Sequence, residues 1–233
     1  MILSIAEVYD LYYSFKDYQA EADQISEIIE STVPGAVTVL DVGCGTGSHH
    51  TFLAEKYQMD GIDINESYID RSKGKNPDGN YQVADMMDFD LGRTYDVVLC
   101  LFSTIGYANN YADLVRTFKA FRRHLKPEGV LIVEPWITPG RIRDGIVDIK
   151  TFENDTYKLC RMNDLLVEGS ISVMNFHYLV GKGGEEVEHI HEVHRLGLYT
   201  VEEMTKAFQE AGFQSSHDEK GLTTRGLYHA RIG

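Results

Sequence analysis

The sequence predicts an α/β fold, with a doubly wound, Rossmann-like sheet of seven strands and an antiparallel β insertion after the fifth strand. Three observations predict it. Short apolar runs alternate with helical segments from about residue 35 to residue 136, glycines follow the first run, and polar and apolar positions alternate beyond Trp136. The chain has 233 residues, 43% of them hydrophobic, which is enough to bury a full core.

The core elements follow one another in a regular order. The first apolar run, "AVTVLDV", is β-branched and ends at glycines, as a buried parallel strand does. Asn65 as N-cap and Glu66 in the first turn predict a helix after the second strand. "KPEG" predicts a turn into the fifth strand. The expected strands are residues 36–42, 58–64, 81–86, 95–103 and 130–136, with helices at 47–57, 65–74 and 110–125.

Beyond the fifth strand the pattern changes. "SISVMNFHYLV" and "EVEHIHEVHRLGLY" alternate polar and apolar residues around the turn "GKGGE", which predicts an antiparallel unit of three strands. Thr200 and Glu203 predict a capping box for a helix that ends at Gly212, and a strand pair then completes the sheet. The expected parts are a helical lid (1–34), a cofactor-binding core (35–136), the insertion (137–199) and a C-terminal helix with its strand pair (200–233).

Charge and composition exclude several classes of function. The 36 acidic and 22 basic residues give a net charge of −14 without a basic run, which disfavours nucleic acid as a partner. Three widely spaced cysteines indicate neither disulfides nor zinc, and "HIHEVH" is one residue short of a zinc-binding H-E-x-x-H motif, so no metal is expected. No segment predicts a signal peptide or membrane span. We therefore expect a cytoplasmic protein with a small-molecule substrate, and the sequence leaves a homodimer open.

The turn "VLDVGCGTG" differs from the dinucleotide fingerprint G-x-G-x-x-G, because no glycine stands at the sixth position in either frame. Asp41 precedes the three glycines at the strand end. A carboxylate there would repel a pyrophosphate but attract an ammonium group, and S-adenosylmethionine carries both an ammonium and a sulfonium. Gly43, Gly45 and Gly47 would let the backbone approach this ligand. The turn therefore predicts S-adenosylmethionine as cofactor.

Two further strand ends also carry acids. Asp63 lies 22 residues after Asp41, where a carboxylate can accept hydrogen bonds from both ribose hydroxyls. Asp85 ends the third strand, where it could receive the adenine amino group while Met86 and Met87 pack on the ring. The remaining candidates for cofactor contact are Ile64 beside the second strand end, and Leu101 and Phe102 just past the fourth strand.

The motifs "VLDVGCGTG", "GIDIN", "VADMMDF" and "LKPEGVLIVEPW" resemble those of class I S-adenosylmethionine-dependent methyltransferases. "VYDLYYSFKDYQAEADQI", "EPWITP", "EVHRLGLYT" and "TTRGLYHA" are similar to segments of the N-methyltransferases that dimethylate nucleotide-linked amino sugars, of the desosamine and mycaminose type. Those relatives usually have Arg-Gly before Lys-Asp-Tyr, whereas this chain has Ser-Phe. The resemblance implies N-methylation of a small-molecule amine, best a dTDP-linked amino sugar. Two alternatives stay open: an N- or O-methyltransferase for a free amino acid or other metabolite, and a cofactor-binding protein without turnover.

Candidate residues for the acceptor side come from both ends of the chain. The tyrosine-rich start would form a lid, with Tyr13 as a catalytic candidate near the acceptor amine and Tyr18 as a cofactor contact; the competing interpretation makes these tyrosines packing aromatics. His194 is the second catalytic candidate, as a proton acceptor. The resemblance suggests that Arg225 contacts the diphosphate of the substrate, which suits a guanidinium. The candidate substrate contacts are Tyr9, Ser103, Trp136 and Arg225.

Overall fold

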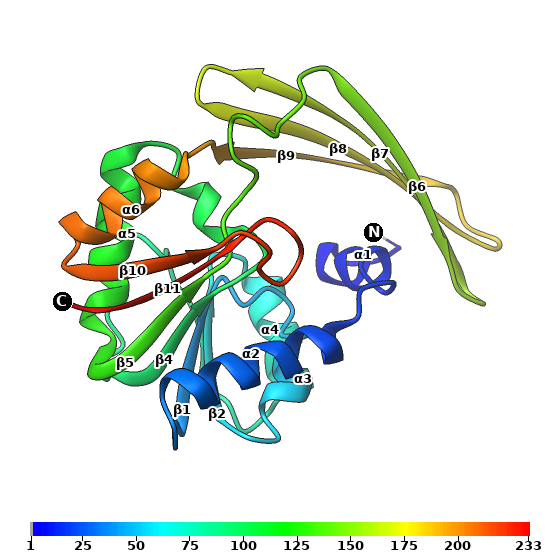
Figure 1. The fold of residues 1–233 in the computed structure, drawn as a ribbon. Helices are drawn as coiled ribbons and strands as arrows, with labels where there is room; N and C mark the ends of the chain where they lie inside the picture. Colours follow the sequence, from blue (N-terminus) through cyan, green and yellow to red (C-terminus); the bar gives the residue numbers. More distant parts are fainter. Residues whose placement is uncertain (1) are drawn as a thin grey trace.

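The computed structural model describes residues 2–233 and consists of two sheets with helices around the larger one (Figure 1). The larger sheet has seven strands in the order β10-β11-β5-β4-β1-β2-β3, and the second is an antiparallel sheet in the order β6-β7-β8-β9. This architecture confirms the predicted α/β fold with an antiparallel insertion after the fifth strand. The strands of the larger sheet are β1 (Thr38–Val42), β2 (Gln58–Asp63), β3 (Tyr81–Val83), β4 (Tyr95–Cys100), β5 (Leu125–Val133), β10 (Phe213–Asp218) and β11 (Leu227–Ile232).

The strand order of the larger sheet reverses between β1 and β4. Both strands are parallel neighbours, with Asp41 opposite Leu99, and β2 follows β1 on one side while β5 follows β4 on the other. Ligands of open α/β sheets bind outside the carboxyl ends of the strands at such a reversal. The topology therefore predicts a ligand site at the loops after β1 and β4.

Helices cover both faces of the larger sheet, because each strand buries residues on both sides. One core cluster joins Leu40 and Val98 to helices α5 and α6, and the other joins Val39 and Val97 to α2 and α3. The helices are α1 (Ile5–Tyr12), α2 (Tyr18–Thr32), α3 (His50–Leu53), α4 (Glu66–Lys75), α5 (Tyr111–Arg123) and α6 (Val201–Glu210), with a 3₁₀ turn η1 (Thr104–Tyr107). None of the helices in the described part of the chain is both long and apolar enough to span a membrane.

The insertion has four strands, so the expected number of three was wrong. The extra strand, β6 (Ile146–Glu153), pairs along its whole length with β7 (Tyr157–Glu168), and β8 (Ile171–Lys182) and β9 (Glu188–Gly197) complete the sheet. Five of the eight residues of β6 are apolar or β-branched, but most of them are exposed, and its sequence lacks clean alternation. Periodicity therefore gave little sign of this edge strand.

Two core elements also differ from the prediction. The helix expected from residue 47 to 57 is reduced to α3, because Gly47 has a left-handed φ of +72° and the chain after Leu53 closes in tighter turns, with Lys56 N donating to Leu53 O at 3.0 Å. "KPEG" is looped out of the β4–β5 ladder: Leu125 lies opposite Tyr95, and the next pair is Val130 with Val97. The strand thus begins before the expected turn.

The N-terminal helix α1 connects the two sheets. Ser4 and Glu7 form its capping box, and Val8 and Tyr12 are buried in a cluster with Phe176 and Tyr178 of the insertion. Figure 1 shows α1 beneath the inner face of the second sheet, near the loop that joins β10 and β11. The N-terminal helix, the insertion and the loop between β10 and β11 therefore come together beyond the carboxyl ends of β1 and β4.

Candidate active site

Asp41 is held at the carboxyl end of β1 by a buried histidine. His50 Nε2 lies 2.9 Å from Asp41 Oδ2, and its Nδ1 lies 2.6 Å from the Tyr81 hydroxyl. Asp41 is 2% exposed, and its Oδ1 has no hydrogen-bond partner among the described residues. A buried carboxylate oxygen needs a donor. An ammonium group would satisfy it, so this side chain fits the amino group of S-adenosylmethionine.

The glycine loop (residues 43–47) follows β1 and packs closely against Thr104 and Ser72. Gly43 has a φ of +74°, and a Cβ there would lie 2.2 Å from the Thr104 side chain, so only glycine fits. Gly45 N donates to Asp63 Oδ2 at 2.9 Å, while Asp63 Oδ1 accepts from Asn65 N at the same distance. Asp63 thereby fixes the loop against the end of β2. Burial raises the pKa of Asp63 despite these hydrogen bonds.

A recess lies between this loop, the N-terminal segment and the turn after β4. It brings together the predicted cofactor residues Tyr18, Asp41, Gly43, Gly45, Leu101 and Phe102 with Tyr9, Cys44, Thr46, Ser48, His49 and Thr104. Tyr9, expected as a substrate contact, thus lines the same recess as the predicted cofactor residues. The sequence interpretation missed His49 and His50, although both stand directly after the glycine loop.

The other predicted cofactor residues lie outside the lining of this recess. Asp85 is exposed, and its Oδ1 accepts from Met87 N at 2.9 Å. Met86 is 7% exposed and belongs to the main core cluster, whereas Met87 is partly buried against that cluster. Ile64 is 74% exposed at the end of β2. Gly47 is buried against Ser72 of α4.

A strained turn follows β4. Phe102 and Ser103 have left-handed φ values of 50° and 67°, which are unfavourable for residues with side chains. The buried carboxylate of Glu134 holds the turn: its Oε2 accepts from Phe102 N at 2.8 Å, and its Oε1 accepts a hydrogen bond from the Thr223 hydroxyl. The sequence analysis gave Glu134 no role, although it directly follows β5. Its neighbour Pro135 accepts from Ser103 Oγ at 2.9 Å.

The structure brings three predicted substrate contacts together beside this turn. Arg225 donates to Ser103 Oγ at 3.2 Å, and its guanidinium lies 5.2 Å from the ring centres of both Phe102 and Trp136. Trp136 donates from its indole nitrogen to Ser172 Oγ at 2.8 Å, which fixes the ring against the insertion. No carboxylate in residues 2–233 forms an ion pair with Arg225. The arrangement presents a cation between two aromatic rings.

Tyr9 of α1 and Tyr13, its C-cap residue, lie on the other side. The rings of Tyr9 and Tyr13 are 4.6 Å apart, and Tyr13 meets Phe102 edge to face at 5.1 Å. Burial raises the pKa of both hydroxyls, so they are protonated at neutral pH. Arg161 of β7, which the sequence interpretation missed, stacks on the Tyr12 ring at 3.8 Å and lies close to Tyr13. A lone arginine within an alternating strand gave no signal of this contact.

His194 lies on the inner face of β9 and meets a residue that the sequence interpretation overlooked. Its Nδ1 is 2.6 Å from the Tyr107 hydroxyl, and its Nε2 is 3.8 Å from Glu192 Oε2. On the opposite, outer face, His177 stacks with both His189 and His191. Among the described residues no cluster of three metal-ligating side chains occurs.

The comparisons with known proteins agree with this geometry. Residues 39–129 match the model of the family described as "Methyltransferase domain". A Streptomyces venezuelae protein named dTDP-3-amino-3,4,6-trideoxy-alpha-D-glucopyranose N,N-dimethyltransferase is 35% identical over 96% of this chain and 95% of its own length. A Streptomyces fradiae protein, named dTDP-3-amino-3,6-dideoxy-alpha-D-glucopyranose N,N-dimethyltransferase, is 34% identical over 96% and 89%.

Solved structures extend the likeness to the whole fold. The crystal structure of DesVI from Streptomyces venezuelae has a TM-score of 0.94 and 33% identity, covering 99% of each chain. CalS10, an amino pentose methyltransferase solved with S-adenosylmethionine bound, has a TM-score of 0.87 and 31% identity over 97% of each chain. These similarities cover the core, the insertion and both ends. The chain is therefore an S-adenosylmethionine-dependent methyltransferase and belongs to the family of sugar N-methyltransferases.

Proposed function

We propose that this enzyme transfers a methyl group from S-adenosylmethionine to the amine of a dTDP-linked amino sugar. The observation that carries the proposal is Arg225, held between Phe102 and Trp136 beside Ser103. In a chain of net charge −14, a guanidinium without a carboxylate partner suits the diphosphate of a nucleotide-linked substrate. The relatives named for dTDP-amino sugars support the same acceptor class.

On the cofactor side, the unpartnered oxygen of Asp41 would receive the amino group of S-adenosylmethionine. The glycine loop, Tyr18 and Leu101 would surround the methionine part, since they line one recess. The carboxylate of Asp63 would accept the ribose hydroxyls in addition to its two backbone donors. Asp85 and Met87, in the loop that follows β3, would bind the adenine, with Ile64 beside it, whereas the side chain of Met86 packs in the core.

When bound, S-adenosylmethionine supplies an electrophilic methyl group on its sulfonium. The protein's main task is then to hold the acceptor amine in line with that group and to exclude water. Phe102, Ser103 and Tyr13 are proposed to do this, because the strained turn and the lid meet there. The left-handed conformation fixes the backbone of Phe102 and Ser103 before the substrate arrives.

The acceptor amine must be neutral to act as a nucleophile, so it has to lose a proton. We assign that proton to His194, either directly or through the Tyr107 hydroxyl that contacts its Nδ1. Glu192 lies 3.8 Å from the other ring nitrogen and would stabilise the imidazolium. Tyr13, protonated at neutral pH, would act as a hydrogen-bond donor rather than as a base.

The test compares Arg225→Ala with the unchanged protein on two acceptors, a dTDP-linked 3-amino sugar and the corresponding free amino sugar. Loss of a bidentate guanidinium contact worth about 3 kcal/mol corresponds to a drop of about 100-fold in kcat/KM for the nucleotide-linked acceptor. The free sugar should be affected far less, and the affinity for S-adenosylhomocysteine by calorimetry should not change. Equal losses on both acceptors, or preference for the free amine by the unchanged protein, would overturn the proposed acceptor.

A further inference from the structure

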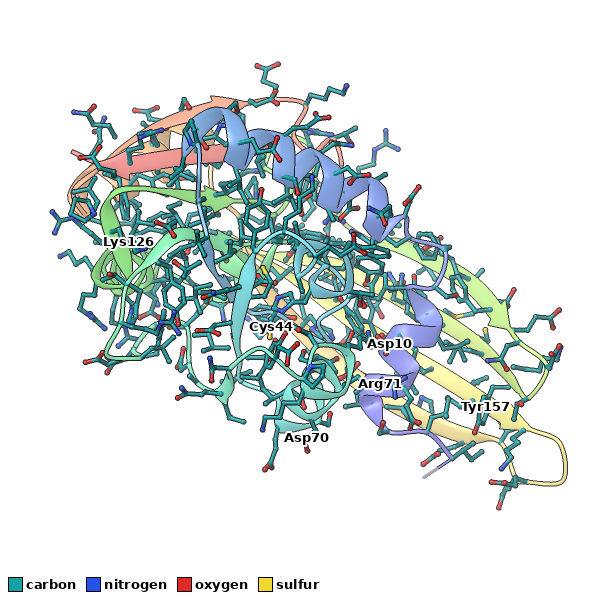
Figure 2. The ribbon with its side chains drawn as sticks, turned by 90° about the horizontal axis from the view of Figure 1, so that it is seen from below. Asp10, Cys44, Asp70, Arg71, Lys126 and Tyr157 are labelled. Carbon is teal, nitrogen blue, oxygen red and sulfur yellow. The ribbon has the colours of Figure 1, made fainter. Side chains whose placement is uncertain are left out.

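The helix α1 is fastened to the glycine loop through one residue, Asp10. Its Oδ1 accepts hydrogen bonds from Thr46 Oγ1 at 2.6 Å and from Lys75 Nζ at 2.9 Å. Its Oδ2 accepts from Arg71 Nε at 2.9 Å, and Figure 2 shows Asp10 and Arg71 side by side. One carboxylate therefore joins α1, the glycine loop and α4.

The hydrogen bonds continue from this junction to the lining of the cofactor recess. Lys75 also donates to Thr46 Oγ1 at 3.1 Å and to Ser48 Oγ at 2.9 Å. Thr46 is 1% exposed, and Thr46 and Ser48 both line the recess. The Tyr18 hydroxyl reaches Ser48 from the start of α2. Asp10 and Lys75 thus lie behind the lining of the recess and contact it through Thr46 and Ser48.

The charges at the junction depend on Asp10. Burial lowers the pKa of Lys75, and the hydrogen bond that Lys75 donates to Asp10 works against this shift by favouring the charged amine. Arg71 is the second cation at the same carboxylate. Without the carboxylate, Lys75 and Arg71 would repel each other at the point where α1 rests on the loop. A neutral replacement should therefore release the helix.

The placement of two aromatic residues, Tyr9 and Tyr13, depends on where Asp10 holds α1. Tyr9 is the neighbour of Asp10 in the chain and lines the recess, and Tyr13 lies about one helical turn further on, where it meets the Phe102 ring at 5.1 Å. The distal side of α1 packs through Tyr12 on the insertion. A shift of α1 away from the glycine loop would therefore move both tyrosines away from the junction of cofactor and acceptor.

We propose that Asp10 is a positioning residue for methyl transfer, which holds α1 on the glycine loop so that cofactor binding and placement of Tyr9 and Tyr13 occur together. This inference rests on the proposed cofactor recess. It does not depend on which amine accepts the methyl group. Asp10 acts through hydrogen bonds and charge, and it is not among the described residues that line the recess.

The experiment measures hydrogen–deuterium exchange of residues 5–12 and calorimetric binding of S-adenosylhomocysteine in Asp10→Asn. Asp70→Asn is the matched control, because Asp70 is exposed on α4 and, within residues 2–233, pairs only with Lys73 at 3.8 Å. We expect Asp10→Asn to speed exchange in α1 about tenfold, to weaken S-adenosylhomocysteine about tenfold and to raise KM for the cofactor more than it lowers kcat. The control should match the unchanged protein.

Lys75→Met provides a second route to the same result. If the junction acts as a unit, this variant also loosens α1, and the double variant with Asp10→Asn binds S-adenosylhomocysteine no more weakly than Asp10→Asn alone. Unchanged exchange in α1, or faster exchange with unchanged affinity, overturns the inference. A failure of the dTDP-linked acceptor in the Arg225 experiment leaves these two readouts unaffected, so the two proposals can fail separately.

Discussion

Replacing Glu134 tests whether the turn after β4 is held in its strained form by one buried carboxylate. Glu134→Ala removes the buried acceptor for Phe102 N and for the Thr223 hydroxyl and leaves the part-buried N–H of Phe102 without this partner. A hydrogen bond to a charged group contributes about 1.5–3 kcal/mol, and an unsatisfied buried group costs about 1–3 kcal/mol. We expect the free energy of unfolding to fall by about 3 kcal/mol.

Glu134→Gln is the matched control. Its amide oxygen can still accept from Phe102 N, and its NH₂ group can donate to the Thr223 oxygen, because a hydroxyl can accept as well as donate. Both hydrogen bonds survive in neutral form, so the loss should be about 1 kcal/mol or less. Urea unfolding followed by the fluorescence of Trp136, the single tryptophan, gives both values.

Glu134→Ala and Glu134→Gln should also differ in kcat/KM for the acceptor. When Phe102 and Ser103 relax from their left-handed conformation in Glu134→Ala, the acceptor side loses its geometry, and we expect kcat/KM for the acceptor to fall at least about 100-fold. Glu134→Gln should keep most of the activity. The reasoning is refuted if the alanine and glutamine variants have the same stability and the same kcat/KM.

Three further predictions concern other parts of the site and the core. Burial raises the pKa of Asp63, so its ionised form costs stability, and that cost grows as the pH rises through the raised pKa. Asp63→Asn removes this cost but keeps one acceptor oxygen for the two backbone donors Gly45 N and Asn65 N, so the urea midpoint at pH 7 should shift little. Calorimetry should show S-adenosylhomocysteine binding about tenfold more weakly; a large loss or gain of stability would contradict this. Burial raises the pKa of Asp96, but hydrogen bonds from Lys126 and the Thr38 region outweigh it and hold that pKa well below its usual range. The ionised Asp96 stabilises the folded state above the pKa of the unfolded chain, and this stabilisation is lost as the pH falls through the lower pKa of the folded state. Asp96→Asn should therefore lower the free energy of unfolding by about 1–2 kcal/mol at pH 7 and by less at pH 3, which urea unfolding at the two pH values would measure. Tyr107→Phe should lower kcat/KM for the acceptor about tenfold without changing S-adenosylhomocysteine affinity, and His194→Ala should add little to it if the two act as one unit; additive losses in initial-rate measurements would argue against a shared proton path.

The order of the core elements could be predicted from sequence because each strand is a short apolar run that ends at a turn or a cap. The strand-end positions of Asp41 and Asp63 followed from the same pattern, since parallel strands place their carboxyl ends at one edge. The capping boxes depend on local residues alone, and the predicted pair Thr200 and Glu203 is present. These features need only short-range information.

Contacts between distant segments left no such signal. Tyr107 and His194 are 87 positions apart, and Glu134 and Thr223 are 89 apart, so no local periodicity relates them. The edge strand β6 was missed because an exposed strand need not alternate cleanly. The pairing of Asp41 with His50 is close in sequence but depends on how the shortened α3 turns back toward β1.

The insertion leaves the core once, after Trp136, and returns once, before Thr200. The glycine loop and the strand-end acids are therefore encoded upstream of it, while all four strands of the second sheet are encoded as one uninterrupted stretch. A recombination event, or a designed exchange of residues 137–199, could alter the choice of amine while the methyl-donor half of the gene stays untouched. Such a hybrid would have to match α1, which packs on the second sheet through Val8 and Tyr12, and Tyr107, which contacts His194. It would also have to match the two crossings, where Trp136 donates to Ser172 and Tyr199 donates to Ala108 O.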